Sequence, residues 1–451
     1  MRLSFLLAGA IALAATTAAL VAQPALADPK SKIDPAVTAS GEHRVIVRVR
    51  DSSKVKSVLN SAEKVKQNKK NVLAAPASEV ADKQSFFVYR GTRAELEKIA
   101  EQSDVVSIRK DKLNAPSLAQ SIPLIGADKA HQQGYDGTGT TIAILDSGID
   151  TDHPAFGNRI VGQACFSSGD PVDGSSSLCP NGGASQFGFG AANAETGACL
   201  EGASNPAYGL CYHGTHVAGI AAGQATADFA ATGVAPNAQI LPVQVFSRFD
   251  NSPYCNGAPV CILAYDSSIL SGMAWVESQS SAYDVASVNL SLGGGQYTSA
   301  CDTGDGADFK ALVDALQSKG IATVVAAGND GFTSSVSWPA CVSNTVAVGS
   351  TTKTDAISSF SNRGRLLDVF APGQSITGAI AGNTYATLSG TSMASPHTAG
   401  AFALLAQKNG SASADQILNA LKTTGKAISY SSGGTTVTTP RINVLAALGA
   451  I

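Results

Sequence analysis

The sequence predicts an α/β protein with a doubly wound, mostly parallel sheet and helices on both faces, preceded by a small α+β domain. Short, uncharged apolar runs alternate with helical patterns, as expected for strands buried on both faces of a parallel sheet. The 45 glycines and the 14% of charged residues suit a compact, loop-rich chain rather than a disordered one. A length of 451 residues accommodates one large and one small domain.

Residues 1–27 have the pattern of a secretion signal. Arg2 gives a positive start, residues 3–22 carry no charge, and Ala-Leu-Ala at 25–27 supplies small residues for cleavage. The alternative is a transmembrane anchor, because the apolar run approaches the length that spans a bilayer. The Ala/Thr-rich composition and the Ala-x-Ala end favour export, so we expect a secreted protein with no membrane anchor.

The cysteine content agrees with export. An even count of eight argues for four disulfides in an oxidising compartment. A zinc site is disfavoured, because the chain has no Cys-x-x-Cys pair and no cysteine beside a His-rich tract. The positions are Cys165, Cys179, Cys199, Cys211, Cys255, Cys261, Cys301 and Cys341.

Charge divides the chain into two parts. Residues 28–118 carry 18 Lys and Arg against 12 Asp and Glu, a net charge of +6. Residues 119–451 carry 12 against 22, a net charge of −10. A basic segment raises nucleic acid as a partner. Here the basic residues are mixed with acids and lack interleaved aromatics, so we expect no nucleic acid and take the acidic part of the same chain as the partner.

Residues 28–118 have the pattern of the small α+β domain. Alternating apolar and polar residues predict strands, and Thr92 with Glu95 forms a capping box at a helix start. The expected order is strand, helix, strand, helix, strand, at 43–50, 51–70, 84–91, 92–103 and 104–110, with a weak extra strand near 71–75. A linker is expected over 113–123.

Residues 119–451 have the pattern of the doubly wound sheet, which binds ligands at the carboxyl ends of its strands. Strands are expected at Thr141–Asp146, Gln239–Phe246, Ala286–Leu292, Ala322–Ala327 and Thr345–Gly349. Helices are expected at His213–Gly223, Ile262–Ser281, Asp305–Lys319, Ser392–Gln407 and Ala414–Leu421. A polar residue directly after one of these strands is therefore a candidate site residue.

An acid and a histidine stand at such places. Asp146 ends an apolar strand, although an Asx turn would explain it alone, and Asp150 and Asp152 are rival acids in the turn. His213 opens a helix, where the dipole disfavours its cationic form. His216 is three residues away, but the glutamate of a His-Glu-x-x-His metal site is absent, so we interpret His216 as a packed core residue.

A serine and an amide complete the set. Ser392 lies at a helix start, where partial positive charge and N–H groups favour a developing oxyanion. Ser389 in the preceding loop and Ser395 inside the helix are the competing serines. Asn329 follows a buried strand and could donate to an oxyanion, although a turn residue would also explain it. Together the acid, histidine, amide and serine are the components of acyl transfer.

Five segments resemble the signature segments of the subtilisin-like serine proteases. They are ILDSGID, HGTHVAG, SLGGG, AAGN and GTSMASPH, and they occur in the order Asp, His, Ser that subtilisin has. The similarity begins near Ala119, where AQSIP resembles the start of the mature enzymes. The basic segment resembles, less sharply, the inhibitory propeptide of the family.

The resemblance implies a role for each candidate. Asp146 would orient the histidine, His213 would be the general base and acid, Ser392 the nucleophile, and Asn329 an oxyanion donor beside the Ser392 N–H. The segment 291–295 would pair with substrate backbone in β-strand fashion. The residues implied in substrate binding are Ser291, Leu292, Gly293, Ala327 and Gly328. The chemistry needs no cofactor, and we assign no metal ligand.

The chain departs from the family in three regions. Residues 224–236 offer Asp228 and few other oxygen side chains, which puts the calcium loop common in the family in doubt and leaves structural Ca²⁺ an open expectation. Insertions at 157–212 and 247–261 are expected to be surface loops stapled by disulfides. We prefer the pairs Cys255–Cys261 and Cys301–Cys341, whereas the pairing of the other four cysteines stays open.

The expected domain organisation is a signal peptide at 1–27, a propeptide at 28–118 and a peptidase domain at 119–451. The expected partners of this monomer are peptide or protein substrates and its own propeptide, as intramolecular chaperone and inhibitor. Two other functions were weighed. A silent binding protein would have lost a triad residue, and none is lost. A serine esterase or acyltransferase would share the triad, but SLGGG argues for a peptide substrate.

Overall fold

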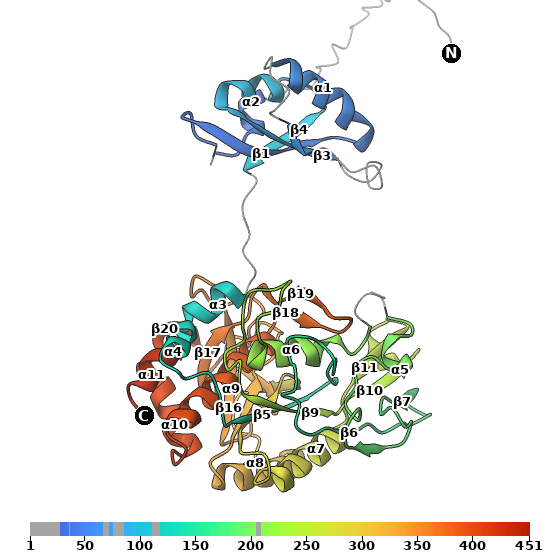
Figure 1. Ribbon diagram of the computed structural model, residues 1–451, viewed down its shortest axis with the longest axis vertical. Helices are drawn as coiled ribbons and strands as arrows, with labels where there is room; N and C mark the ends of the chain where they lie inside the picture. The colour runs from blue at the N-terminus through green and yellow to red at the C-terminus, as the bar shows by residue number, and fades with distance from the viewer. Residues whose placement is uncertain (1–27, 36, 66–71, 75–84, 111–117, 204–208) are drawn as a thin grey trace, which may run out of the picture. The chain divides into compact units, whose positions relative to one another are not determined.

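A computed structural model describes residues 28–35, 37–65, 72–74, 85–110, 118–203 and 209–451. The chain folds as two compact units, Met1–Asn114 and Ala115–Ile451, and each contains its own hydrophobic core. The smaller unit is blue in Figure 1, and the larger runs from cyan to red. No helix within the described residues combines the length and the apolar character that crossing a membrane requires.

The smaller unit is a four-stranded antiparallel sheet in the order β2-β3-β1-β4, with both helices packed on one face. Its elements are β1 Glu42–Val49, α1 Val55–Val65, β2 Val72–Ala74, β3 Phe86–Thr92, α2 Arg93–Ala100 and β4 Val105–Lys110. Each predicted strand and helix is present, and the weak extra strand is β2. Thr92 caps α2 in the predicted capping box, with its backbone N–H donating to Glu95 at 2.8 Å. The predicted end of the first helix, at 66–70, lies outside the described residues.

The larger unit is built on a ten-stranded sheet in the order β20-β21-β17-β16-β14-β12-β5-β9-β6-β8. Its strands are β5 Thr141–Asp146, β6 Ala164–Phe166, β8 Ser185–Phe187, β9 Gln239–Gln244, β12 Val285–Leu290, β14 Ala322–Ala326, β16 Thr345–Thr351, β17 Val369–Pro372, β20 Lys426–Ser432 and β21 Thr435–Arg441. The seven pairings from β6 to β21 are parallel, and only the two edge strands pair antiparallel. The predicted doubly wound, mostly parallel sheet is confirmed.

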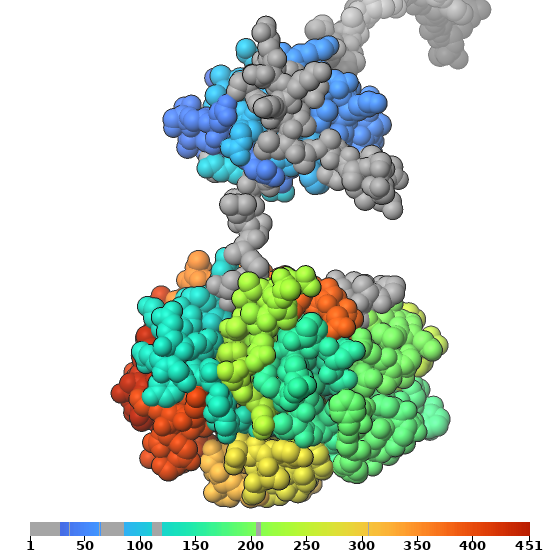
Figure 2. All heavy atoms as spheres, in the orientation of Figure 1, coloured from blue at the N-terminus to red at the C-terminus, as the bar shows by residue number. Residues whose placement is uncertain are grey.

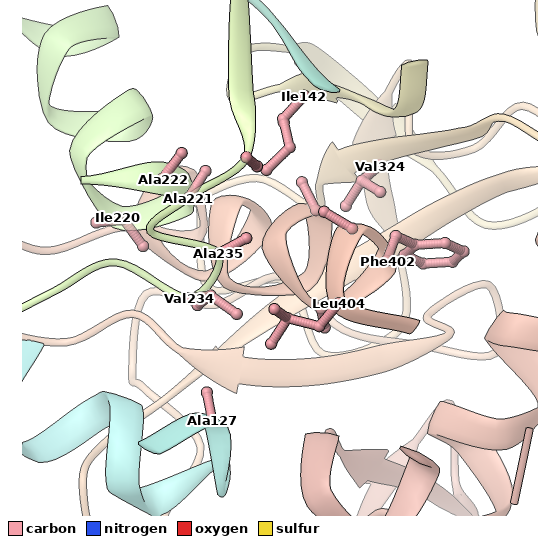
Figure 3. Packing of buried hydrophobic residues seen from close by; sticks show 14 of the residues in the cluster. Ala127, Ile142, Ile220, Ala221, Ala222, Val234, Ala235, Val324, Phe402 and Leu404 are labelled. Carbon is pink, nitrogen blue, oxygen red and sulfur yellow. The ribbon is translucent and has the colours of Figure 1, made fainter. Parts of the chain in front are cut away.

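Helices cover both faces of this sheet. They are α3 Leu118–Leu124, α4 Ala127–Gln132, α5 Gly197–Leu200, α6 Tyr212–Ala222, α7 Asp266–Gln279, α8 Ala307–Ser318, α9 Thr391–Lys408, α10 Ala414–Thr424 and α11 Val444–Leu448. Ile142 of β5 and Val324 of β14 pack in one core with Ile220 of α6 and Phe402 of α9, as Figure 3 shows. Intervening strand residues such as Leu145 pack on the opposite face against α7 and α8. Because successive side chains alternate between faces, strands buried on both faces must be apolar throughout.

The largest differences from the predicted elements are at two boundaries and in one insertion. The helix expected from Ile262 begins at Asp266, because the β-branched residues before it form β11 (Val260–Leu263). The linker expected through 123 becomes helical at Leu118, whereas 111–117 lie outside the described residues. The second insertion is a hairpin of β10 (Ser247–Asp250) with β11, which β7 (Ser175–Ser177) from the first insertion extends to three strands.

The eight cysteines form four disulfides. Cys255–Cys261 and Cys301–Cys341 are the two preferred pairs, and both are confirmed. The structure pairs the other four cysteines in sequence order, as Cys165–Cys179 and Cys199–Cys211. Three of the four bridges lie within or between the strands and turns of the two insertions, which supports the expectation that crosslinks hold these segments in place.

A partly buried arginine ties together three segments around α6. The Arg159 guanidinium donates to the carbonyl oxygens of Ala222, Ala155 and Ala238, at 2.6, 2.7 and 2.9 Å. Burial lowers its pKa to about 10, so the group stays charged at neutral pH. In Figure 2 the yellow-green surface belongs to the segment that follows α6 and lies beside the cyan surface of α3 and α4. His131 of α4 forms a hydrogen bond with the Val234 carbonyl oxygen at 2.8 Å.

Candidate active site

The predicted acid and histidine are hydrogen-bonded. Asp146 is the last residue of β5, fully buried, and its Oδ1 accepts from His213 Nδ1 at 2.8 Å. His213 lies in the first turn of α6, which approaches β5 closely because Gly214 has no side chain. A Cβ at Gly214 would stand 2.1 Å from the Gly148 carbonyl oxygen. The glycine after the histidine is therefore a steric requirement of this pair.

The Asp146 carboxylate determines which nitrogen of His213 carries the proton. Because a carboxylate only accepts hydrogen bonds, Nδ1 is the donor, and the neutral ring keeps an unprotonated Nε2. Burial alone would lower the pKa of His213, but the charge and hydrogen bond of Asp146 outweigh it and raise the pKa above its ordinary value. With 25% of its side chain exposed, the ring can reach a substrate.

Ser392 is the second residue of α9, after Gly390 as N-cap. Its hydroxyl donates to the Ser291 carbonyl oxygen at 3.3 Å. At this position the hydroxyl and the backbone N–H lie in the partial positive field of the helix N-terminus. Pro396, the sixth residue of α9, lies inside the helix, where it has no N–H to donate to the Ser392 carbonyl.

Two hydrogen bonds to its Oδ1 oxygen fix the orientation of the Asn329 side chain. Oδ1 accepts from the backbone N–H of Thr391 at 2.8 Å and from the Thr391 hydroxyl at 3.0 Å. This leaves the Nδ2 amide as the donor end of the side chain, at the start of α9. The Thr391 hydroxyl also accepts from the Gly328 N–H at 3.1 Å. This hydrogen bond joins the segment after β14 to the start of α9.

His213, Ser392 and Asn329 line one open cleft of about 830 Å³. Four of the five predicted substrate residues, Ser291, Leu292, Gly293 and Gly328, line it as well. The fifth, Ala327, is fully buried, and its neighbour Ala326 is among the lining residues. The Ala327 side chain packs in the hydrophobic core, and its backbone is hydrogen-bonded to Val348 and Ser337.

Gly293 and Gly328 are required by close approaches at the cleft. Gly293 has φ of 153°, and a Cβ there would stand 2.3 Å from the Trp338 carbonyl oxygen. Gly328 has φ of 104°, and a Cβ there would meet Ser337 Oγ at 2.3 Å. The extended segment continues into β13 (Gly294–Tyr297), which pairs antiparallel with β15 (Val336–Trp338).

The competing residues are held elsewhere. His216 is fully buried, its Nε2 lies 3.2 and 3.1 Å from the carbonyl oxygens of Ile376 and Ala386, and burial lowers its pKa to about 3. The Ser389 hydroxyl accepts from the Ser375 N–H at 2.8 Å. The Ser395 hydroxyl donates to Asn289 at 2.7 Å. Each therefore has a structural hydrogen bond outside the pair formed by Asp146 and His213.

One group of carboxylates among the described residues is compact enough to share a cation. The oxygens of Asp150, Asp152 and Glu195 lie within 4.8 Å of one another. Asp150 is fully buried and accepts from the N–H groups of Asp152 and Asn383. Burial, and then a side-chain hydrogen bond with the Asp152 carboxyl group, raise its pKa to about 7. The rival acids of the sequence thus form a cluster of their own, apart from the His213 bond.

Two residues that the sequence analysis did not single out organise the site. Ser147 accepts from the Gly214 N–H at 3.0 Å and donates to the Cys211 carbonyl oxygen at 3.1 Å, which joins β5 to the start of α6. Asn289 is a fully buried amide near the end of β12. A polar amide inside a mostly apolar strand, in SVNLSLGGG, was the available signal for Asn289.

Comparisons with known proteins show which family the chain resembles in sequence. A family profile described as the subtilase family matches residues 137–443. Subtilisin E of Bacillus subtilis is 33% identical over 336 residues, which cover 73% of this chain and 72% of the relative. An alkaline protease of Alkalihalobacillus alcalophilus is 34% identical over 73% of this chain and 71% of its own length. A crystal structure of a cold adapted subtilisin-like serine proteinase matches 68% of this chain and 90% of that chain, at 31% identity and a TM-score of 0.46.

Proposed function

Because this chain belongs to the subtilase family and is a serine endopeptidase, we propose that Asp146, His213 and Ser392 carry its reaction, that Asn329 stabilises the oxyanion, and that the enzyme is secreted as a self-processing precursor. The observation that carries the catalytic part is the convergence of His213, Ser392 and Asn329 on one cleft, with Asp146 bonded behind the histidine.

Acylation begins with the hydroxyl of Ser392. Nε2 of His213 takes the hydroxyl proton while Oγ attacks the peptide carbonyl, and the Asp146 carboxylate stabilises the imidazolium that forms. The raised pKa of His213 expresses this stabilisation of the charged ring. His213 then gives the proton to the leaving amine, and an acyl group remains on Ser392. Water attacks this ester with His213 again as base, which restores the enzyme.

The carbonyl oxygen becomes an anion in each tetrahedral intermediate. Asn329 Nδ2 and the Ser392 N–H are the donors we assign to it, and both lie at the N-terminus of α9. Because Thr391 holds Asn329 Oδ1, the amide is oriented before substrate arrives. Donors that need no reorganisation stabilise the transition state more than the ground state.

The peptide substrate pairs with residues 291–293, whose glycine leaves room beside the chain. We expect kcat/KM to rise by roughly 10²-fold when a peptide amide is lengthened from one to four residues before the scissile bond, because remote backbone pairing contributes to transition-state binding. Steady-state kinetics on a chromogenic series measures this. A simple acetyl ester provides the comparison. Hydrolysis of that ester without cleavage of any peptide would favour the esterase alternative.

Four features of the chain support secretion as a precursor. Residues 1–27 have the pattern of an export signal, and all eight cysteines are disulfide-bonded. The segment 28–118 has a net charge of +6, against −10 for the rest. The sheet face of the smaller unit that the helices leave uncovered exposes arginines at adjacent positions: Arg44, Arg48, Arg90 and Arg109. This face suits an acidic protein surface.

We predict that the secreted enzyme begins within a few residues of Ala119, and that the isolated segment 28–118 inhibits it. Leu118 would then precede the scissile bond. Inhibition should weaken as salt rises, because opposite charges drive the association. N-terminal sequencing and inhibition assays at two ionic strengths measure both parts.

A segment carrying Arg48→Glu and Arg90→Glu is the matched control, since both side chains are exposed outside the hydrophobic core. It should inhibit less at low salt and approach the unaltered segment at high salt. An active secreted enzyme that still begins at Asp28 would refute processing. If the isolated segment 28–118 folds but does not inhibit the enzyme, its role would be only that of a linker.

A further inference from the structure

The backbone carbonyl of Ser392 has no i+4 hydrogen-bond donor within its own helix, α9. In an α-helix the carbonyl of residue 392 would accept from the N–H of residue 396, but that residue is proline and has no N–H. The Ser291 hydroxyl donates to this Ser392 carbonyl at 2.8 Å instead. In return the Ser392 hydroxyl donates to the Ser291 carbonyl at 3.3 Å. The two residues are therefore joined by a reciprocal pair of hydrogen bonds.

The hydroxyl of Ser291 is in turn oriented by a buried amide. Asn289 Nδ2 donates to Ser291 Oγ at 3.0 Å, and Asn289 Oδ1 accepts from the Ser395 hydroxyl at 2.7 Å. The directions agree, because each hydroxyl has one proton and uses it once. Ser395 donates to Asn289, Asn289 donates to Ser291, and Ser291 keeps its own proton for the Ser392 carbonyl.

This chain of hydrogen bonds is enclosed. Asn289 and Ser395 are fully buried, and Ser291 is 3% exposed. In such surroundings a broken link leaves an unsatisfied polar group, so the arrangement is strongly preferred over alternatives. These hydrogen bonds start at Ser395 in α9, run to Asn289 in β12 and return through Ser291 to the first turn of α9. They close a loop between the substrate-pairing segment and the residue that attacks the substrate.

We propose that Asn289 and Ser395 are positioning residues for the hydrolytic reaction. They hold Ser291–Gly293, which carries the substrate backbone, at a set distance from Ser392. Neither residue lines the cleft, so each acts through Ser291. The proposal rests on the proposed role of Ser392 as nucleophile. A displacement of about 1 Å between attacking and attacked atoms is enough to lower a rate by roughly 10²-fold.

The test is the kinetics of Asn289→Leu and Ser395→Ala in the full chain. Leucine keeps the branched shape of asparagine without its hydrogen bonds. We expect kcat on an extended peptide to fall by roughly 10- to 100-fold in Asn289→Leu, with KM changed by less than about threefold, because substrate contacts remain while the reacting atoms shift. Ser395→Ala should lower kcat less, and the double variant should be no slower than Asn289→Leu, because both act through one chain.

Ser287→Ala is the matched control. Ser287 lies on the same strand, is fully buried, and its hydroxyl donates to the Ala399 carbonyl oxygen of the same helix at 3.0 Å. It removes a bond of the same kind, but two turns away from Ser392. Urea midpoints should fall for this variant as for Ser395→Ala, whereas its kcat should stay near that of the unaltered enzyme.

The outcomes separate the possibilities. Unchanged kcat in Asn289→Leu, or an equal loss of kcat in Ser287→Ala, would overturn the positioning role. If Asn289→Leu does not fold, the smaller change Ser395→Ala decides, and a kcat equal to that of Ser287→Ala would overturn the proposal. Activity surviving in Ser392→Ala would instead remove the nucleophile assignment on which it rests. Inactive Ser392→Ala with a fully active Asn289→Leu would reject the positioning role alone.

Discussion

Ser392→Ala is expected to abolish peptide hydrolysis and to leave the chain uncut near Ala119. Removing the nucleophile of such a triad typically costs on the order of 10⁶-fold in kcat, because water must then attack without covalent help. The fold should survive, since the hydroxyl makes one long bond, at 3.3 Å, in the resting enzyme. Peptide assays together with the molecular mass of the secreted protein measure both effects.

The neighbouring serines supply the controls. Ser389→Ala removes a hydroxyl from the loop before α9 and should retain turnover and processing, because that hydroxyl serves the Ser375 N–H. Turnover like that of the unaltered enzyme in Ser392→Ala would mean that another group attacks the peptide. Ser389 and Ser395 would then be the next serines to replace.

Asn329→Leu is expected to lower kcat by roughly 10²–10³-fold with little change in KM, as the loss of one oxyanion donor does. The amide should matter only when the carbonyl oxygen carries charge, so ground-state binding is spared. Steady-state kinetics on an extended peptide separates the two constants.

Because Asn329 also accepts hydrogen bonds from Thr391, a second variant is needed to isolate the role of its Nδ2 donor. Leucine also loses the acceptor for the Thr391 N–H and hydroxyl, so a change in α9 must be distinguished from the loss of a donor. Asn329→Asp keeps the acceptor oxygens but removes the Nδ2 donor, and should be as slow as Asn329→Leu. A loss that appears mainly in KM for either variant would make Asn329 a substrate-binding residue instead.

Much of the fold followed from patterns that depend on near neighbours in the chain. The apolar run before Asp146 predicted a strand buried on both faces, and it forms the interior strand β5. The capping box at Thr92 marked a helix start that the structure confirms. The preferred disulfide Cys255–Cys261, between cysteines six positions apart, is also present.

The sequence by itself therefore determined the α/β class, most of the buried strands and the candidates at their ends. Only the tertiary structure decided how the first four cysteines pair, that the insertions add strands β6, β7 and β8, and that Ala327 faces away from the cleft. It also decided that Ser395 bonds Asn289, 106 positions earlier in the chain. Local propensity sets periodicity and caps, whereas a buried polar group takes whichever partner the packing of distant elements brings within hydrogen-bond reach.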